Sequence, residues 1–283
     1  MRQTAQKERQ GMKVISLLNL KGGVAKTFTT VNMAYELYRR GYKVLLLDND
    51  KQGNLSKAYG RYDAENIAPI TRLLSGEWAS AAELIQKTDY EGIDIVSANM
   101  SLMGATWKLT TEETGNQIER YKRLLAAKIE CYGDCTVWGK YDYCIIDNPP
   151  DIGINVVNAL TVTDEVIVPV KIDEWALEGL DILADQIEEA RKYNPALYLR
   201  GVVITAYQNT DGEAAGAEWL EKKLQGIVGT GVYGKDFILW TVRYSRKVAE
   251  STFLFKPIYE YSPCCGAAQD YKKLVTTYTG KGR

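Results

Sequence analysis

Short apolar runs alternate along the chain with longer segments in which apolar residues recur every three or four positions. Several of the runs are continuous stretches of Val, Ile and Leu, which is typical of strands that are buried on both faces of a parallel sheet. The longer segments have the period of helices that cover such a sheet. Seven runs are predicted to be strands: Lys13–Asn19, Lys43–Asp48, Ile93–Ser97, Tyr143–Asp147, Glu165–Val170, Gly201–Thr205 and Phe237–Val242.

The helical segments lie between these strands and after the last one. A final helix is expected over about Ala267–Tyr278, and no repeat, low-complexity block or long linker divides the chain. We therefore expect an α/β fold: a single doubly wound, mostly parallel sheet with helices on both faces, formed by residues 12–283 after a flexible tail at residues 1–11. Two further groups of residues have helical spacing: Val31, Ala34, Leu37 and Tyr38, and Ala176, Leu180, Leu183 and Ile187.

Composition excludes several kinds of chemistry. The 283 residues include no histidine, so the commonest general base and metal ligand are missing. The net charge of −1 gives no overall attraction to nucleic acid or anionic membranes, so binding to either would need a local patch. No apolar run reaches the ~18 residues of a membrane span. The five irregularly spaced cysteines are expected to be free thiols in a reducing cytoplasm.

A glycine-containing turn with two lysines joins the first strand to the first helix. It ends in Lys26 and Thr27, where the helix begins. A helix N-terminus offers N–H groups to an anion, Lys26 adds a charge for the β- and γ-phosphates, and the Thr27 hydroxyl can ligate Mg²⁺. The ordinary P-loop pattern has glycine where Leu20 and Ala25 stand, so this loop reads K-G-G-x-x-K-[ST]. If position 25 needs a positive φ, alanine costs ~1 kcal/mol there.

Carboxylates follow two of the predicted strands. Asp48 and Asp50 end the second strand, and Asp147 ends the fourth, before Pro149-Pro150. Polar residues where a strand runs into a loop are common without any function. The carboxyl ends of parallel strands are, however, where α/β folds bind ligands, and an aspartate there holds Mg²⁺ in P-loop NTPases.

These three motifs resemble those of the ParA/Soj/MinD family of deviant Walker-A ATPases. The resemblance implies that Lys21 reaches across a dimer to the partner's nucleotide and that Asp50 orients the attacking water. It also implies that Mg²⁺ is held by Thr27, Asp48 and Asp147, partly through water. Nucleotide contacts are expected from the whole loop: Lys21, Gly22, Gly23, Val24, Ala25, Lys26, Thr27 and Phe28. Gln208 and Asn209 are candidates for adenine contacts.

The resemblance continues through Val166–Val170 and Trp240–Lys256. ParA-like members bind DNA non-specifically as ATP dimers, whereas MinD-like members bind membranes through a C-terminal amphipathic helix. From Gly234 to Arg283, nine Lys/Arg and four Asp/Glu give a net charge of +5. Within this segment Arg243, Arg246 and Lys247 are candidates for phosphate contacts, although a solvated basic helix end is the plain alternative. The tail from Lys272 has too little apolar area for a membrane anchor.

We therefore expect an ATP- and Mg²⁺-dependent ATPase that partitions a plasmid, chromosome or mobile element. It would be cytoplasmic, dimeric in the ATP state, nucleoid-associated through non-specific DNA binding, and stimulated by a ParB-like partner. The alternatives are a MinD-like membrane-associated positioning ATPase or a non-partition regulator of the same family. An iron–sulfur site at Cys131, Cys135, Cys264 and Cys265 lacks the usual C-x-x-C spacing, and the C-terminal tyrosines indicate packing rather than a tyrosine-kinase tail.

Overall fold

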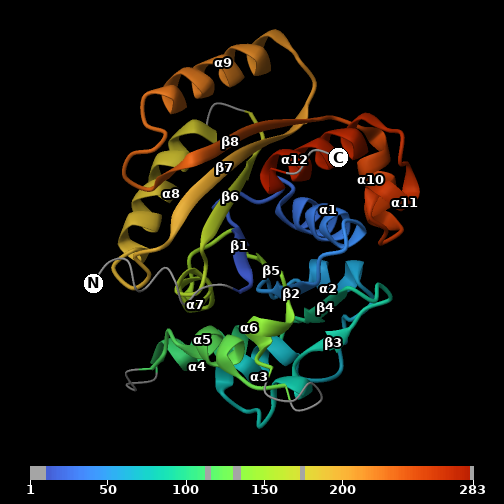
Figure 1. The fold of residues 1–283 in the computed structure, drawn as a ribbon, viewed down its shortest axis with the longest axis vertical. Helices are drawn as coiled ribbons and strands as arrows, with labels where there is room; N and C mark the ends of the chain where they lie inside the picture. Colours follow the sequence, from blue (N-terminus) through green and yellow to red (C-terminus); the bar gives the residue numbers. More distant parts are fainter. Residues whose placement is uncertain (1–10, 112–115, 130–134, 173–175, 281–283) are drawn as a thin grey trace.

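A computed structural model describes residues 11–111, 116–129, 135–172 and 176–280 of the chain. They form one sheet with the strand order β3-β4-β2-β5-β1-β6-β7-β8 (Figure 1). All neighbouring strands are parallel except β3, which is antiparallel to β4. The strands are β1 Lys13–Leu17, β2 Val44–Asp48, β3 Gln86–Lys87, β4 Ile93–Val96, β5 Tyr143–Asp147, β6 Glu165–Val170, β7 Tyr198–Tyr207 and β8 Tyr233–Arg243.

All seven predicted strands are present, and the predicted fold class is confirmed. The prediction missed β3, because its two residues are polar and lie at the edge of the sheet. It also began β7 and β8 too late. Arg200 and Asp236 interrupt the apolar runs in these strands, but they form an ion pair with each other (3.3 Å) and the strands continue through them.

Helices cover both faces of the sheet. On one face α1 and α12 lie side by side (Figure 1) and bury Ile15 and Leu17 of β1 beneath them. The other face is covered by α3–α5 over β2 and β5, and by α7–α9 over β6 and β7. The helices are α1 Lys26–Arg39, α2 Asn54–Ala58, α3 Pro69–Ser75, α4 Leu102–Thr111, α5 Arg120–Ala126, α6 Val137–Lys140, α7 Ile154–Leu160, α8 Ala176–Ala190, α9 Asp211–Gln225, α10 Arg246–Phe253, α11 Ile258–Tyr261 and α12 Gly266–Thr279, with a 3₁₀ turn at Ala81–Glu83.

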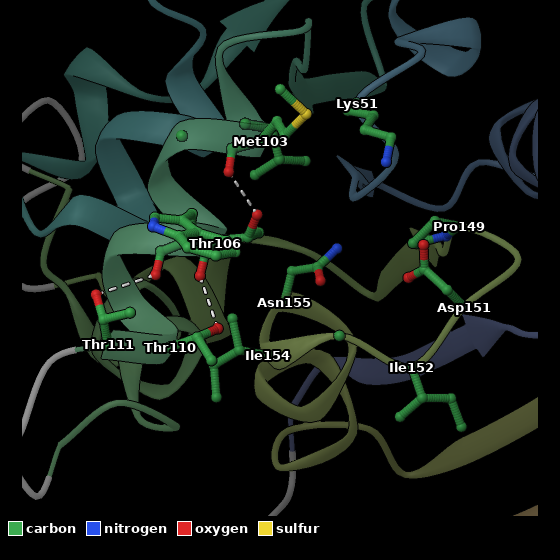
Figure 2. A pocket seen from close by; sticks show the side chains of 14 residues that line it. Lys51, Met103, Thr106, Thr110, Thr111, Pro149, Asp151, Ile152, Ile154 and Asn155 are labelled. Atoms are coloured by element: carbon green, nitrogen blue, oxygen red, sulfur yellow. Dashed lines mark hydrogen bonds between the residues drawn. The ribbon is translucent and has the colours of Figure 1, made fainter.

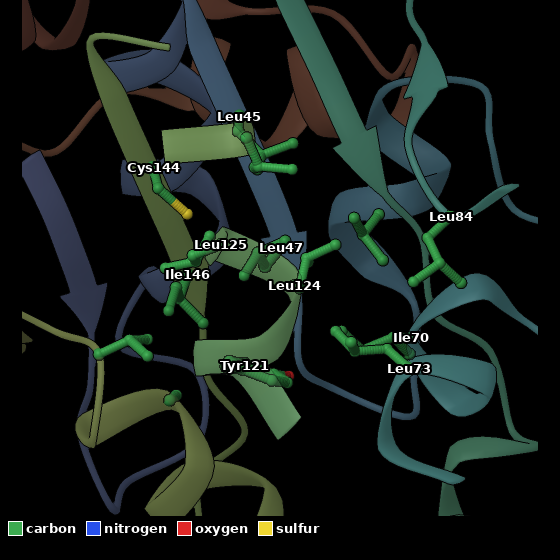
Figure 3. Close-up of a cluster of buried hydrophobic side chains, with 14 of the residues drawn as sticks. Leu45, Leu47, Ile70, Leu73, Leu84, Tyr121, Leu124, Leu125, Cys144 and Ile146 are labelled. Atoms are coloured by element: carbon green, nitrogen blue, oxygen red, sulfur yellow. The ribbon is translucent and has the colours of Figure 1, made fainter. Parts of the chain in front are cut away.

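The core under α5 illustrates how the alternation along a strand divides the two faces. Leu45 and Leu47 of β2 point to this side, together with Cys144 and Ile146 of β5 (Figure 3). The intervening β2 residues pack against α1 on the opposite face. Each fully buried Leu or Ile side chain contributes ~1.5–3 kcal/mol through the apolar area removed from water. Both faces of β2 must therefore stay apolar until the strand reaches Asp48.

One buried carboxylate away from the predicted site is paired through one of its two oxygens, Oδ2. Asp94, in β4, accepts hydrogen bonds from Tyr141 (2.6 Å), Lys140 (3.0 Å) and Lys87 (3.0 Å). Burial by itself would raise the pKa of Asp94, but these three donors outweigh it and lower the pKa below its ordinary value. Asp94 thus stabilises the fold in its charged form.

The chain ends are described only in part. Residues 1–10 of the predicted tail lie outside the described residues, so the expected tail stays a prediction. Within the described ranges, none of the helices has both the length and the apolar composition that a bilayer crossing requires.

Candidate functional site

The phosphate loop runs from the end of β1 to the start of α1 at Lys26 and is held from several sides. The Asn19 side chain accepts from the Lys21 N–H (2.9 Å) and donates to the Pro169 carbonyl of β6 (2.8 Å). The buried Lys26 ammonium donates to the carbonyls of Asn19 (3.0 Å) and Lys21 (2.9 Å). The loop is therefore closed around Lys26 at the positive end of α1.

Ala25 has the conformation that glycine favours. Its φ of 67° and ψ of 30° lie in the left-handed region, immediately before the first residue of α1. The sequence analysis considered a positive φ at position 25, and the structure shows that Ala25 has one. Ala25, with its strained backbone, is the last residue of the loop before Lys26 and Thr27.

Replacing Ala25 with glycine is expected to increase the free energy of unfolding by up to ~1 kcal/mol, because glycine adopts this φ without steric cost. Chemical denaturation monitored by circular dichroism would measure the change. The control is Ala214→Gly, because Ala214 lies inside α9, where glycine costs ~0.5–1 kcal/mol. A loss of stability in both variants would contradict a strained Ala25.

The two buried aspartates are neighbours in the sheet. Asp48 of β2 and Asp147 of β5 are register partners at the carboxyl ends of their strands. The Thr27 hydroxyl donates to Asp147 Oδ2 (2.6 Å) and so connects the phosphate loop to β5. Burial raises the pKa of Asp147 to about 8, and the nearby charges of Asp48 and Asp50 act in the same direction. A buried carboxylate of this kind is stabilised by a cation beside it.

Asp48 has a more structural environment. Its Oδ2 accepts from the N–H (2.8 Å) and the hydroxyl (2.6 Å) of Ser56, and its Oδ1 accepts from the Asp50 N–H (3.2 Å). Burial raises the pKa of Asp48 to about 6, against the effect of these donors. The carboxylate thus fixes the turn between β2 and α2, and its role near Mg²⁺ stays a prediction.

A cavity of about 520 Å³ opens beside the loop. Asp50 lines it together with Lys26, and α10 and the turn after it contribute further lining residues. The structure therefore brings the predicted loop and the predicted water-orienting carboxylate to one cavity. Burial lowers the pKa of Lys26, whereas the charges of Asp147, Asp50 and Asp151 raise it. The loop residues on the wall are Gly22, Gly23, Ala25, Lys26, Thr27 and Phe28.

A second cavity, of about 660 Å³, lies on the other side of Pro149-Pro150. Figure 2 shows Met103 and Thr106 of α4 on one side and Pro149 and Asp151 on the other, with Asn155 of α7 between them. The same loop that follows Asp147 therefore borders both cavities.

The candidates for adenine contacts lie elsewhere. A recess of about 190 Å³ behind the loop is lined by Ala25, Phe28 and Tyr271, among others, and neither Gln208 nor Asn209 lines it. The Asn209 side chain accepts from the Tyr207 hydroxyl (2.9 Å). The structure gives these two residues no contact with either cavity at the loop, and their role stays a prediction.

The predicted basic patch is partly neutralised. The Arg243 guanidinium forms two hydrogen bonds of 2.8 Å with the Asp270 carboxylate of α12, and Lys247 pairs with Glu250 (2.7 Å). Arg246 is exposed at the first turn of α10. Arg243 therefore joins β8 to α12, and Arg246 is the member of the patch that the structure leaves best placed to contact phosphate.

The cysteines do not form a metal site in the described residues. Cys131 lies outside them, and within them no group of three or more Cys, Asp or Glu side chains is arranged to hold a metal ion. The sequence analysis missed the asparagines at the strand ends: the half-buried Asn19 and the buried Asn49 and Asn148. Their signal was an asparagine directly after an apolar run.

The comparisons with known proteins agree with this geometry. The AAA domain family matches residues 12–199. The chromosome partitioning protein ParA of Caulobacter vibrioides is 32% identical over 273 residues, 96% of each chain, and the sporulation initiation inhibitor protein Soj of Bacillus subtilis is 32% identical over 95% of this chain and 99% of Soj. Cobyrinic acid a,c-diamide synthase from Mycobacterium smegmatis, solved with ADP and magnesium, has a TM-score of 0.72 at 25% identity, covering 95% of this chain and 97% of that one. The cell division ATPase MinD of Pyrococcus furiosus shares the fold, with a TM-score of 0.71 at 21% identity, covering 95% of this chain and 98% of its own. The chain therefore belongs to the ParA/Soj family of P-loop ATPases.

Proposed function

We propose that this protein is a partition ATPase that binds Mg·ATP at the loop before α1, dimerises in the ATP state and then binds DNA non-specifically. The observation that carries the proposal is the hydrogen bond between the Thr27 hydroxyl and Asp147, beside the buried Lys26. This contact brings together a helix N-terminus, a lysine, a hydroxyl and a carboxylate, which are the groups that P-loop NTPases use to bind a nucleoside triphosphate.

Each residue has a distinct task in this proposal. The loop N–H groups and Lys26 bind the phosphates, and Asp50 orients the water that attacks the γ-phosphate. Thr27 and Asp147 would hold Mg²⁺, whose charge neutralises the phosphate oxygens. The raised pKa of Asp147, caused by its burial, supports a cation at this position. Lys21 would reach the phosphates of the partner subunit. Hydrolysis is expected to be slow until a ParB-like partner stimulates it, and to release ADP-bound subunits from DNA.

One feature favours a membrane-associated positioning ATPase as the second candidate. Phe253 is 85% exposed at the end of α10, and Leu254 and Phe255 are exposed beside it. Phe255 has a φ of 52°, and Lys256 follows it at the surface. Exposed apolar side chains next to cations are what an anionic lipid surface binds. DNA stays the first candidate because ParA and Soj are the sequence relatives.

The DNA prediction concerns Arg246. Sedimentation of the protein with DNA, or with anionic liposomes, is compared in ATP and in ADP. We expect retention on DNA in ATP only, and Arg246→Ala is expected to weaken it ~3–10-fold and to lower the salt slope by about one, as loss of a phosphate contact does. Lys222→Ala is the control, since Lys222 lies on α9 and pairs with Glu218. Equal retention on DNA in ADP and in ATP, or unchanged retention of Arg246→Ala on DNA, would contradict the proposed DNA binding. Retention on anionic liposomes in place of DNA would favour the second candidate.

A further inference from the structure

A buried chain of amide side chains links the two loops that carry the carboxylates. Asn49 follows Asp48 at the end of β2, and Asn148 follows Asp147 at the end of β5. The Asn49 side-chain N–H₂ donates to the Asn148 side-chain carbonyl (2.8 Å), and the Asn148 N–H₂ donates to the Leu17 backbone carbonyl (3.1 Å). Both asparagines are buried. The ends of β2, β5 and β1 are therefore connected by side chains as well as by the sheet.

Asn49 also connects this chain to two helices. Its side-chain oxygen accepts from the Tyr121 hydroxyl of α5 (2.7 Å), and its backbone carbonyl accepts from Asn155 of α7 (3.0 Å). Its backbone N–H donates to the Asp147 carbonyl (3.0 Å). Each polar group of Asn49 thus has a partner. Figure 3 shows Tyr121 among Leu124, Leu125 and the apolar side chains of β2 and β5, so its ring is fixed by packing.

Apolar side chains would fill these positions as easily. The side chains of β2 and β5 that precede Asp48 and Asp147 include leucine, isoleucine and cysteine, and a buried amide is costly unless all its hydrogen bonds are made. What the amides add is directional geometry: a shift of either loop would leave several buried groups without partners. Asn49 stands between Asp48 and Asp50, so its fixed position also fixes theirs.

We infer that Asn49 and Asn148, with Tyr121 and Asn155, are positioning residues that hold the Asp50 loop and the Asp147 loop in one mutual geometry for phosphoryl transfer. The inference rests on the proposed ATP hydrolysis. These hydrogen bonds extend to Tyr121 of α5 and Asn155 of α7, neither of which lines the cavity beside the phosphate loop. Asn155 lines the second cavity, beside α4 (Figure 2). A displacement of α7 would therefore reach both carboxylate loops through Asn49.

Steady-state ATPase kinetics test this inference. Tyr121→Phe removes one hydroxyl from a ring that stays packed, and it is expected to lower kcat about threefold to tenfold; Asn49→Leu is expected to lower kcat ~100-fold, as small displacements at a site do. The KM for ATP should change less than kcat in both, because the phosphate loop keeps its own sequence and the contacts of Lys26 with the Asn19 and Lys21 carbonyls. The matched control is Asn194→Ala, a buried asparagine that donates to the Leu160 and Thr163 carbonyls, and its kcat should not change.

The double variant Asn49→Leu/Asn148→Leu separates positioning from stability. Removing both amides leaves fewer unpaired groups than removing one, so thermal stability should recover relative to Asn49→Leu while kcat stays low. Recovery of kcat together with stability, or unchanged kcat in Tyr121→Phe and Asn49→Leu, would overturn the inference.

Hydrogen–deuterium exchange distinguishes this inference from the proposed function. In Tyr121→Phe, amide exchange should become faster in both residues 48–53 and residues 147–153. In Asn194→Ala, exchange should stay unchanged in both segments. If the wild-type protein hydrolyses no ATP, the proposed function is wrong, and the exchange data alone decide whether the amide chain couples the loops. Unchanged exchange in both segments would show that it does not.

Discussion

Replacing Asp50 with alanine is expected to lower the rate of ATP hydrolysis ~10²–10³-fold while Mg·ATP binding persists. Asp50 lines the same cavity as Lys26 and residues of α10. Removing a carboxylate that orients or activates the attacking water costs a factor of this order. Its own contribution to the fold is small: Oδ1 accepts a hydrogen bond from the Gln52 N–H (2.9 Å) in an exposed turn. The loss should therefore fall on chemistry and not on stability.

Phosphate release measures the rate, and light scattering after gel filtration measures the dimer in ATP. Under the proposed function, Asp50→Ala accumulates as a dimer in ATP, because the step that dissolves the dimer is blocked. Asp151→Ala is the control, since Asp151 is an exposed carboxylate near Lys26 that lies outside the motif. If Asp50→Ala hydrolysed ATP at the wild-type rate, water would have to be oriented by another residue.

The strands that could be predicted are those whose burial is complete. Residues of β2 are buried on both faces, and the sequence Val-Leu-Leu-Leu indicates this directly. The phosphate loop was predictable for a similar reason, because its function depends on residues that are adjacent in the sequence. Even the strain at Ala25 followed from one comparison with the ordinary glycine pattern.

Contacts between distant residues could not be read in this way. The role of Arg243 in DNA binding stays a prediction, and its partner Asp270, 27 positions further along the chain, could not be identified from the sequence. The Asn49–Asn148 hydrogen bond joins residues 99 positions apart. Asn49 and Asn148, each taken alone, are ordinary polar residues after a strand. Only the parallel order β2-β5-β1 places them together, and periodicity does not determine strand order.

Asp147→Asn is expected to stabilise the nucleotide-free protein and to abolish Mg²⁺-dependent ATP binding. Burial raises the pKa of Asp147 to about 8, above the ~4 of an unfolded chain. The folded state then binds more protons than the unfolded state between these values, so stability falls as pH rises toward 8. Asparagine removes this charge, keeps an oxygen for the Thr27 hydroxyl, and should increase the free energy of unfolding at pH 8 by up to ~5 kcal/mol.

Thermal denaturation between pH 6 and pH 9, with and without Mg·ATP, checks both effects of Asp147→Asn. Wild-type protein should lose stability with rising pH and recover it with Mg·ATP, because the cation replaces the proton. The variant should show a flatter pH dependence and no Mg²⁺-dependent gain, with ATP affinity in Mg²⁺ lowered ~10²-fold or more. Asp94→Asn is the control of opposite sign: its pKa is lowered by Tyr141 and two lysines, so amidation should destabilise the fold at neutral pH. If Asp147→Asn were destabilising as well, the Asp147 carboxylate would stabilise the fold in its charged form, as Asp94 does. The nucleotide-free protein would then hold no buried, uncompensated charge for a cation to neutralise.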